Sequence, residues 1–235
     1  MAGQGYHFGL AALAAKYLDR EFTQEMKVGV LLIDALNRAS GCRRRSHFTG
    51  GAGCIIPHYH DLRQIADIQS WDSCYKRSYI VDPKINMRLF EAANIHITES
   101  DYKDGIRMHL LGDKYYDFFV QQVLFDVSKQ KEGIILSKFT GEVIDGAAFR
   151  KEIYSIYPML DQFLLDMAEI THQDVEDAKE LVSVVFNDEM ASFVSKYLNF
   201  REGLKWKDTR FFKKEHIQTL VSDATTGIAE YLSKK

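Results

Sequence analysis

Apolar side chains recur with a helical period along most of this chain, and helix breakers are scarce. Only three prolines occur in 235 residues, at positions 57, 83 and 158. Residues three and four apart share one face of a helix, so the pattern predicts amphipathic helices. The length permits one compact domain or two small ones. We therefore predict an all-α fold, a single irregular multi-helix domain that covers residues 1–235.

The pattern divides this domain into a first half, about residues 1–127, and a helical C-terminal half, about residues 146–235. The glycine-rich segment 39–57 and most of 128–145 read as loops, with a possible strand at 133–136. Thr23 and the box Thr171–Asp174 are expected helix caps, and Pro158 is expected to kink or split its helix. Helices are expected at about 6–20, 23–38, 58–69, 83–93, 98–126 (or 100–126), 146–170, 171–186, 188–198 and 213–232.

The composition is that of an ordinary globular protein. Hydrophobic residues make up 46% of the chain and charged residues 27%, with a formal net charge of -3. This balance argues against a general nucleic-acid binder. Three cysteines without C-x-x-C spacing argue against a disulfide framework or a cysteine-based zinc site. We expect a cytoplasmic protein, because the N-terminus does not read as a signal peptide and no segment as a transmembrane helix.

The segment 105–119 carries a histidine and an aspartate on the apolar face of a predicted helix. His109 and Asp113 are four residues apart and so point to the same side. The same face carries Ile106, Tyr116, Val120 and Val123. Burying an unpaired carboxylate costs several kcal/mol, so Asp113 needs a partner. A metal ion is one candidate, and a buried salt bridge is the other.

Three more residues of the first half are candidate metal ligands. His7 lies on the first helix above small residues, although a lone histidine is more often a core residue bonded to a carbonyl. Asp34 ends an apolar run, where it either faces a cavity or pairs with Arg38. His47 lies in the glycine-rich loop, which either brings it to a metal or is simply solvated.

Weaker candidates complete the set. Arg44 and Arg45 have the chemistry to hold a phosphate. His58 and His60, followed by Asp61, form a short cluster of metal-ligand types. His172 and Glu176 have i, i+4 spacing, but the helical wheel places them at the edge of the apolar face, which favours a helix-start role. The remaining lower-ranked candidate ligand is Asp117.

The order of His7, Asp34, His47 and His109-x-x-Gly112-Asp113 resembles the zinc-dependent phospholipase C and S1/P1 nuclease superfamily. The chain is more similar still to the uncharacterised bacterial branch of that superfamily. Two of its segments appear here as Ser46-His47-Phe48 and as the run from Gly105 to Tyr115. The match covers roughly the first 120 residues, and the H-x-x-G-D step is its most specific part.

The resemblance implies an all-helical fold that holds metals in a cleft between helices, and hydrolysis of a phosphoester by metal-bound hydroxide. Carried over by motif, His47, His109, Asp113 and Asp34 surround one zinc ion, and Asp113 bridges to a neighbouring metal bound by His7. No histidine follows shortly after Asp113, and residue 1 is Met where the classical enzymes use an N-terminal tryptophan. We therefore expect one or two ions, with iron or manganese as alternatives to zinc.

Function follows from this expected site. A small phosphoester is the expected substrate, and Asp34 is the expected catalytic group, as both ligand and general base. One rival is an HD-type metal phosphohydrolase that uses His60 and Asp61. The other is a non-catalytic helical interaction protein, in which His109 and Asp113 form a buried polar network. We expect no sequence-specific nucleic-acid binding, and the sequence does not identify an oligomeric state.

Overall fold

A computed structural model describes residues 3–40 (backbone only for 37–40), 46–49, 54–64, 85–98, 100–129 and 132–234. Helices dominate these residues, so the all-α prediction is confirmed. The first half contains α1 (Gln4–Tyr17), α2 (Gln24–Ser40), the 3-10 helix η1 (Tyr59–Gln64), α4 (Met87–Ala93), α5 (Asp101–Phe118) and the π-helical turn η3 (Phe119–Leu124). The rest contains β1 (Phe125–Asp126), β2 (Ile135–Ser137), β3 (Val143–Ile144), α6 (Gly146–Met167), α7 (His172–Val185), α8 (Asp188–Tyr197) and α9 (Lys214–Ser233).

Helix starts follow the local capping chemistry of the sequence. The Thr23 hydroxyl accepts a hydrogen bond from the Met26 amide at 3.3 Å, as expected for a cap on α2. Thr171 and Asp174 form the expected capping box on α7. These short-range features were predictable because the partners lie within three residues of each other.

Pro158 lies inside the continuous helix α6, so the predicted alternative of a split is wrong. A proline removes one intrahelical hydrogen bond, here the one to the Tyr154 carbonyl. Ile156 before the proline and Leu160 after it are both buried. Packing on both sides thus keeps the helix continuous.

The π-helical turn after α5 overturns one assignment to the buried face. Val120 is buried as expected, but Val123 is 47% exposed, and Leu124 is buried instead. A π turn contains more residues than an α turn, so the side chains that follow Phe118 are rotated relative to the wheel. The apolar pattern alone does not reveal this change of period.

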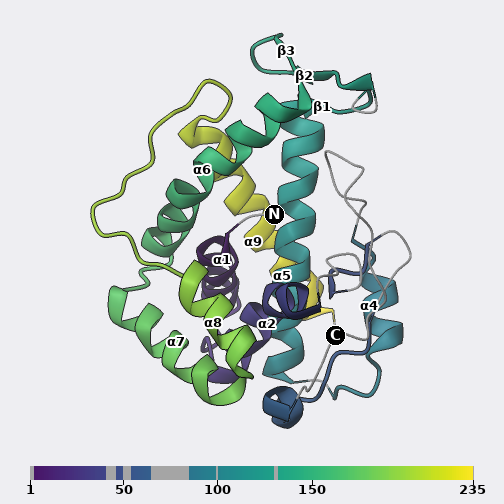
Figure 1. Cartoon of the computed structure of the whole chain (residues 1–235), viewed down its shortest axis with the longest axis vertical. Helices are drawn as coiled ribbons and strands as arrows, with labels where there is room; N and C mark the ends of the chain where they lie inside the picture. The colour runs from purple at the N-terminus through teal and green to yellow at the C-terminus, as the bar shows by residue number, and fades with distance from the viewer. Residues whose placement is uncertain are drawn as a thin grey trace.

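The small sheet stands at the end of α5 and η3 (Figure 1). Its strands are antiparallel in the order β1-β2-β3, and Phe125 pairs with Ser137 while Ile135 pairs with Ile144. The strand expected at 133–136 is therefore present, shifted to Ile135–Ser137. A second strand in this range, β3 at Val143–Ile144, was not predicted, and the other described residues of 128–145 are irregular.

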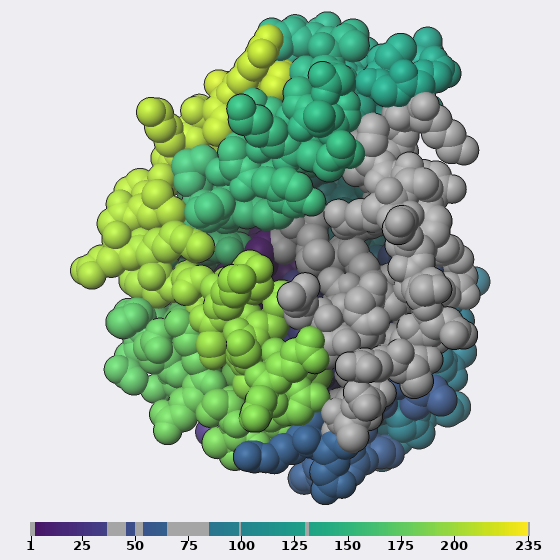
Figure 2. Space-filling model, in the orientation of Figure 1, coloured from purple at the N-terminus to yellow at the C-terminus, as the bar shows by residue number. Residues whose placement is uncertain are grey.

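Helix α1 lies in the middle of the helical assembly. It packs against α2, α5, α6 and α9, and one hydrophobic core contains residues from both halves of the chain. On the face shown in Figure 2, the residues of α1 are visible only as small areas between those of the later helices. None of the described helices is long and apolar enough to span a membrane.

Candidate metal centre

Helices α2 and α5 cross at two glycines, and this crossing builds one wall of the site. A Cβ at Gly105 would overlap the carbonyl of Met26, and one at Gly29 would overlap the carbonyl of Tyr102. The two backbones are therefore in direct contact, which requires glycine at both positions. One turn beyond Gly105 lies His109, whose Nδ1 donates a hydrogen bond to the Val30 carbonyl at 2.8 Å.

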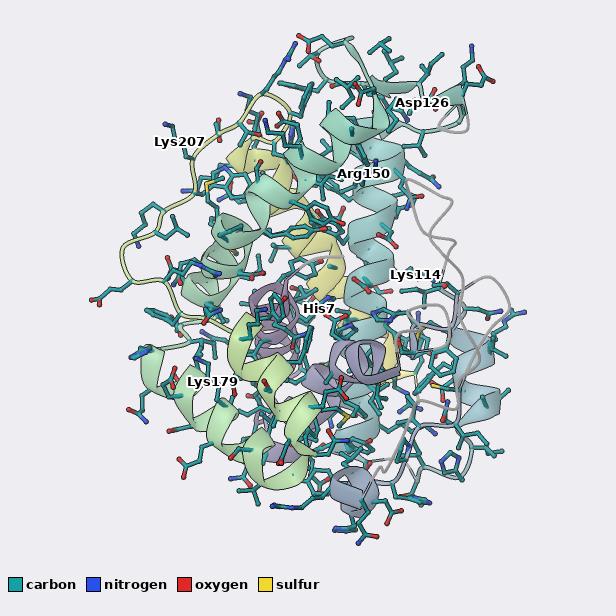
Figure 3. The ribbon with its side chains drawn as sticks, viewed as in Figure 1. His7, Lys114, Asp126, Arg150, Lys179 and Lys207 are labelled. Carbon is teal, nitrogen blue, oxygen red and sulfur yellow. The ribbon has the colours of Figure 1, made fainter. Side chains whose placement is uncertain are left out.

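Helix α1 supplies His7 from the interior of the molecule (Figure 3). The His7 ring stacks on the His109 ring, with centroids 3.8 Å apart and planes 16° apart. Gly112 leaves the space for this ring, because a Cβ there would lie 3.3 Å from His7 Nδ1. His7 Nε2 lies 3.3 Å from Asp113 Oδ1.

The start of α1 is fixed by a carboxylate from α6. Asp161 accepts a hydrogen bond from the Tyr6 amide at 3.0 Å, and the Gly3 N-cap position provides no side-chain cap. Asp161 is 4% exposed, and burial raises its pKa to about 7, although amide donors at Tyr6 and Gly5 oppose the rise. Asp161 therefore acts as a cap from another helix and positions the turn that bears His7.

His47 approaches from the segment 46–49 and completes the arrangement. Its Nε2 lies 3.2 Å from Asp34 Oδ1 and 3.3 Å from Asp113 Oδ2. Its Nδ1 lies 2.8 Å from the Ser46 hydroxyl. His109 Nε2 lies 4.0 Å from the same two oxygens. Four atoms thus face a common centre: Nε2 of His47, Nε2 of His109, Oδ1 of Asp34 and Oδ2 of Asp113.

These separations match the spacing of ligands around one ion. In tetrahedral zinc sites with ligands at about 2.0–2.1 Å, adjacent ligand atoms lie about 3.3 Å apart. The four distances given above lie between 3.2 and 4.0 Å. The remaining Asp113 oxygen faces His7, and a ligand atom of His7 also lies within 4.8 Å of ligand atoms of Asp34 and His109.

The protonation of His109 follows from its hydrogen bond. The Val30 carbonyl only accepts, so Nδ1 carries the proton. Burial, with opposition from Asp34 and Asp113, lowers the pKa of His109 to about 3, which leaves Nε2 with a free lone pair at neutral pH. Nε2 has no hydrogen-bond partner among the described residues. A histidine nitrogen whose lone pair faces carboxylate oxygens is oriented to bind a cation together with them.

Asp34 is held in its ionised form by the histidines around it. Burial raises its pKa, but the hydrogen bond from His47 and the neighbouring imidazoles outweigh burial and lower the pKa below the usual value. Gln4 Nε2 donates to Asp34 Oδ2 at 2.8 Å. This bond turns the other oxygen, Oδ1, toward His47 and His109. The side chain of Arg38, the alternative partner, lies outside the description.

Sequence reasoning missed the supporting residues Gln4 and Asp161, and it named Ser46 only as part of the Ser46-His47-Phe48 segment. Asp161 carried a signal in the sequence, because Leu164 and Leu165, three and four residues later, are apolar. Asp161 therefore lies on an apolar face of its helix, as Asp113 does. Gln4 carried none, since its role depends on where α1 meets α2. The structure brings together the five first-ranked candidates, and each is at most 2% exposed: His7, Asp34, His47, His109 and Asp113.

The lower-ranked candidates lie elsewhere. His172 and Glu176 are exposed on α7 and pair with each other at 3.6 Å, which fits the helix-start reading, with His172 directly after the Thr171 cap. Asp117 is half-buried in the wall of a small cavity of about 100 Å³. Arg44 and Arg45 lie outside the described residues.

The HD-type arrangement finds no support in the described residues. His58, His60 and Asp61 are exposed. The ring of His58 contacts His96 at 5.0 Å, and that of His60 contacts Tyr59 at 5.5 Å. On the described part of the chain, the groups of three ligand atoms close enough to share an ion come from the buried cluster alone.

The chain matches no protein-family model, no curated protein and no solved structure in the comparisons with known proteins.

Proposed function

We propose that the buried cluster binds one or two divalent metal ions and that the protein hydrolyses a small phosphoester. The observation that carries the proposal is the unprotonated Nε2 of His109, which faces Asp34 and Asp113 without a hydrogen-bond partner among the described residues. Nitrogen and oxygen ligands favour zinc, with iron and manganese as alternatives. The order of the ligands along the chain, similar to that of zinc-dependent phospholipase C, supports the choice of reaction.

Each residue has a separate role in this proposal. Asp34, His47, His109 and Asp113 hold the first ion, and His7 with the far oxygen of Asp113 contributes to a second position. A bound ion supplies a water of lowered pKa and polarises the phosphoryl oxygen. Asp34, ionised and oriented by Gln4, accepts the proton of the attacking water.

The burial of the ligands favours a second candidate function, a structural metal site. Structural zinc sites are closed, whereas catalytic ones keep a position open for water or substrate. All five residues are at most 2% exposed. In that case the ion stabilises the contact of α1, α2 and α5, and the protein works through its surface.

Hydrolysis of p-nitrophenyl phosphate and bis(p-nitrophenyl) phosphate by the metal-loaded protein separates the two candidates. We expect turnover that is lost with a chelator and that falls about 100-fold or more in Asp34→Asn. Asp177→Asn, a change on the exposed face of α7, is the matched control and keeps full activity. Stoichiometric metal without hydrolysis of either ester would assign the site to structure.

A further inference from the structure

The segment that bears His47 is fastened to the short helix α4. The Asn86 amide donates to the Phe48 carbonyl at 3.0 Å, and Thr49 forms an isolated antiparallel bridge with Ile85. The ring of Phe48 packs edge-on against Phe90 of α4 at 5.3 Å. The position of the backbone of this segment, and that of the Phe48 side chain, therefore depends on the position of α4.

Phe48, directly after His47, has a backbone that its surroundings must hold. Its φ is 53°, in the left-handed region that bulky residues rarely adopt. Such a conformation persists only where neighbouring contacts over-determine it. Phe48 is fully buried, and the contacts to Asn86 and Phe90 meet that requirement.

The other end of α4 fixes the chain that follows this segment. The Asn94 side chain, fully buried, accepts from the Ile56 amide at 2.6 Å and donates to the Cys54 carbonyl at 3.3 Å. His96 Nε2 donates to the Ile56 carbonyl at 2.8 Å. Helix α4 thus holds the chain on both sides of the segment between Thr49 and Cys54.

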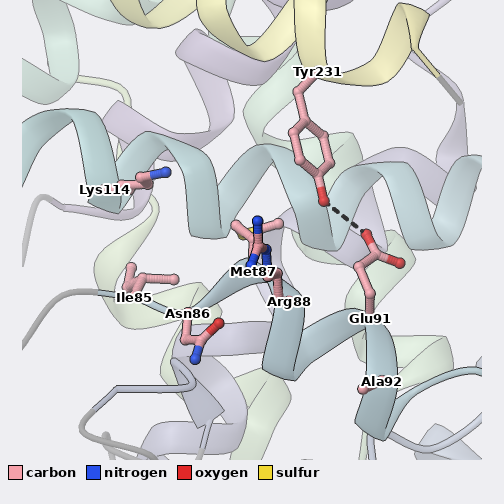
Figure 4. Close-up of a pocket in the computed structure, with 8 residues that line it drawn as sticks. All are labelled: Ile85, Asn86, Met87, Arg88, Glu91, Ala92, Lys114 and Tyr231. Carbon is pink, nitrogen blue, oxygen red and sulfur yellow. Dashed lines mark hydrogen bonds between the residues drawn. The ribbon is translucent and has the colours of Figure 1, made fainter.

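One carboxylate anchors α4 to the rest of the protein. Arg107 of α5 donates Nε and one terminal nitrogen to the two Glu91 oxygens, at 2.9 and 3.0 Å. Tyr231 of α9 donates its hydroxyl to Glu91 at 3.1 Å, beside a pocket lined by α4, α5 and α9 (Figure 4). Arg107 is fully buried, and a bidentate pair of this kind fixes orientation as well as distance.

We infer that Glu91 and Arg107 are a positioning pair for His47. Arg107 lies on the same helix as His109 and Asp113, so the pair sets α4, and through α4 the His47 segment, against the helix that carries two other ligands. The contacts described for the pair beyond each other are those of Glu91 with Tyr231 and Lys103 and of Arg107 with Asp104, and none of these three is a candidate ligand. The consequence for metal binding rests on the proposed function, but the consequence for the position of His47 does not.

The test compares Glu91→Ala and Glu91→Gln with Asp101→Asn. Asp101 pairs with Arg20 at 2.7 Å at the start of α5, so its substitution perturbs the same helix without a described contact to α4. The first readout is backbone hydrogen exchange in metal-free protein. We expect exchange at 46–49 to rise about tenfold or more in Glu91→Ala, to rise less in Glu91→Gln, and to stay unchanged in Asp101→Asn.

The second readout is the affinity for Zn²⁺ and the visible spectrum with Co²⁺. Glu91→Ala is expected to weaken Zn²⁺ binding by about 10–100-fold and to alter the Co²⁺ spectrum, because His47 leaves the ion. A variant that is only less stable would keep the Co²⁺ spectrum of the wild type. Tyr231→Phe removes the hydroxyl that donates to the Glu91 carboxylate and replaces Glu91→Ala in the test if that variant does not fold. We expect it to show the same changes to a smaller degree.

The two readouts separate the two proposals. Unchanged exchange at 46–49 in folded Glu91→Ala, or an equal rise in Asp101→Asn, would overturn the positioning role. Faster exchange in a protein whose wild type binds no metal would uphold the positioning role and reject the proposed function.

Discussion

At the scale of single residues, one hydrogen bond determines the chemistry of His109. The Val30 carbonyl fixes the proton on Nδ1 and leaves Nε2 facing Asp34 and Asp113. The i, i+4 spacing of His109 and Asp113 was readable from the sequence, because it depends only on helix geometry. The acceptor at Val30 was not, because it depends on how α2 crosses α5.

Asp161 gives a prediction on pH dependence. Its pKa is raised to about 7, mainly by burial, whereas the unfolded value is about 3.9. Between these values the folded protein keeps a proton that the unfolded chain releases. The free energy of unfolding therefore falls as pH rises through this range, with a contribution of up to about 1.4 kcal/mol per pH unit.

Asp161→Asn removes this titration and keeps an oxygen that can accept from the Tyr6 amide. Denaturant unfolding of both proteins in chelator, across about pH 5 to 7, is the measurement. The wild type should lose stability with rising pH relative to the variant. Parallel stability curves would show that Asp161 is ionised in the folded state throughout.

At the scale of elements, local signals were predictable and contacts between elements were not. Thr23 and the box at Thr171 marked helix starts correctly, since both partners of each cap are near neighbours in sequence. The unbroken passage of α6 through Pro158 depends on tertiary packing, and so does the π-helical turn at Phe119–Leu124. Tertiary packing routinely overrides local propensity in this way.

The α2–α5 crossing gives a prediction at this scale. Gly105→Ala places a methyl group against the Met26 carbonyl, and overpacking of this kind costs about 1–3 kcal/mol. The gain in helix propensity, about 1 kcal/mol, offsets only part of that. We expect a net loss of stability, measured by denaturant unfolding.

Gly227→Ala in α9 is the matched control. Its methyl group would overlap the hydroxyl and ring of Tyr115 and no backbone atom, so only a half-buried side chain has to move, and the stability should fall by about 1 kcal/mol or less. If Gly105→Ala is no less stable than Gly227→Ala, the two backbones are not in the close contact described here.

At the scale of the whole molecule, the candidate site combines parts that are far apart in sequence. It draws on α1, α2, the segment 46–49 and α5, while α6 fixes the start of α1 through Asp161. The five candidate ligands were predicted from their order along the chain, which resembles that of the zinc-dependent phospholipase C and S1/P1 nuclease superfamily. Their convergence required the packing of α1 among helices from both halves of the chain, which the hydrophobic pattern does not specify.

The central claim is that this convergence exists to hold a metal ion, and elemental analysis of purified protein tests it most directly. The wild type, His109→Ala and the exposed control His172→Ala are compared after incubation with Zn²⁺, Mn²⁺ or Fe²⁺ and removal of excess ion. We predict stoichiometric metal in the wild type and the control, and its loss in His109→Ala. Absence of metal from all three would make the His–Asp cluster a buried polar network and contradict the proposed function.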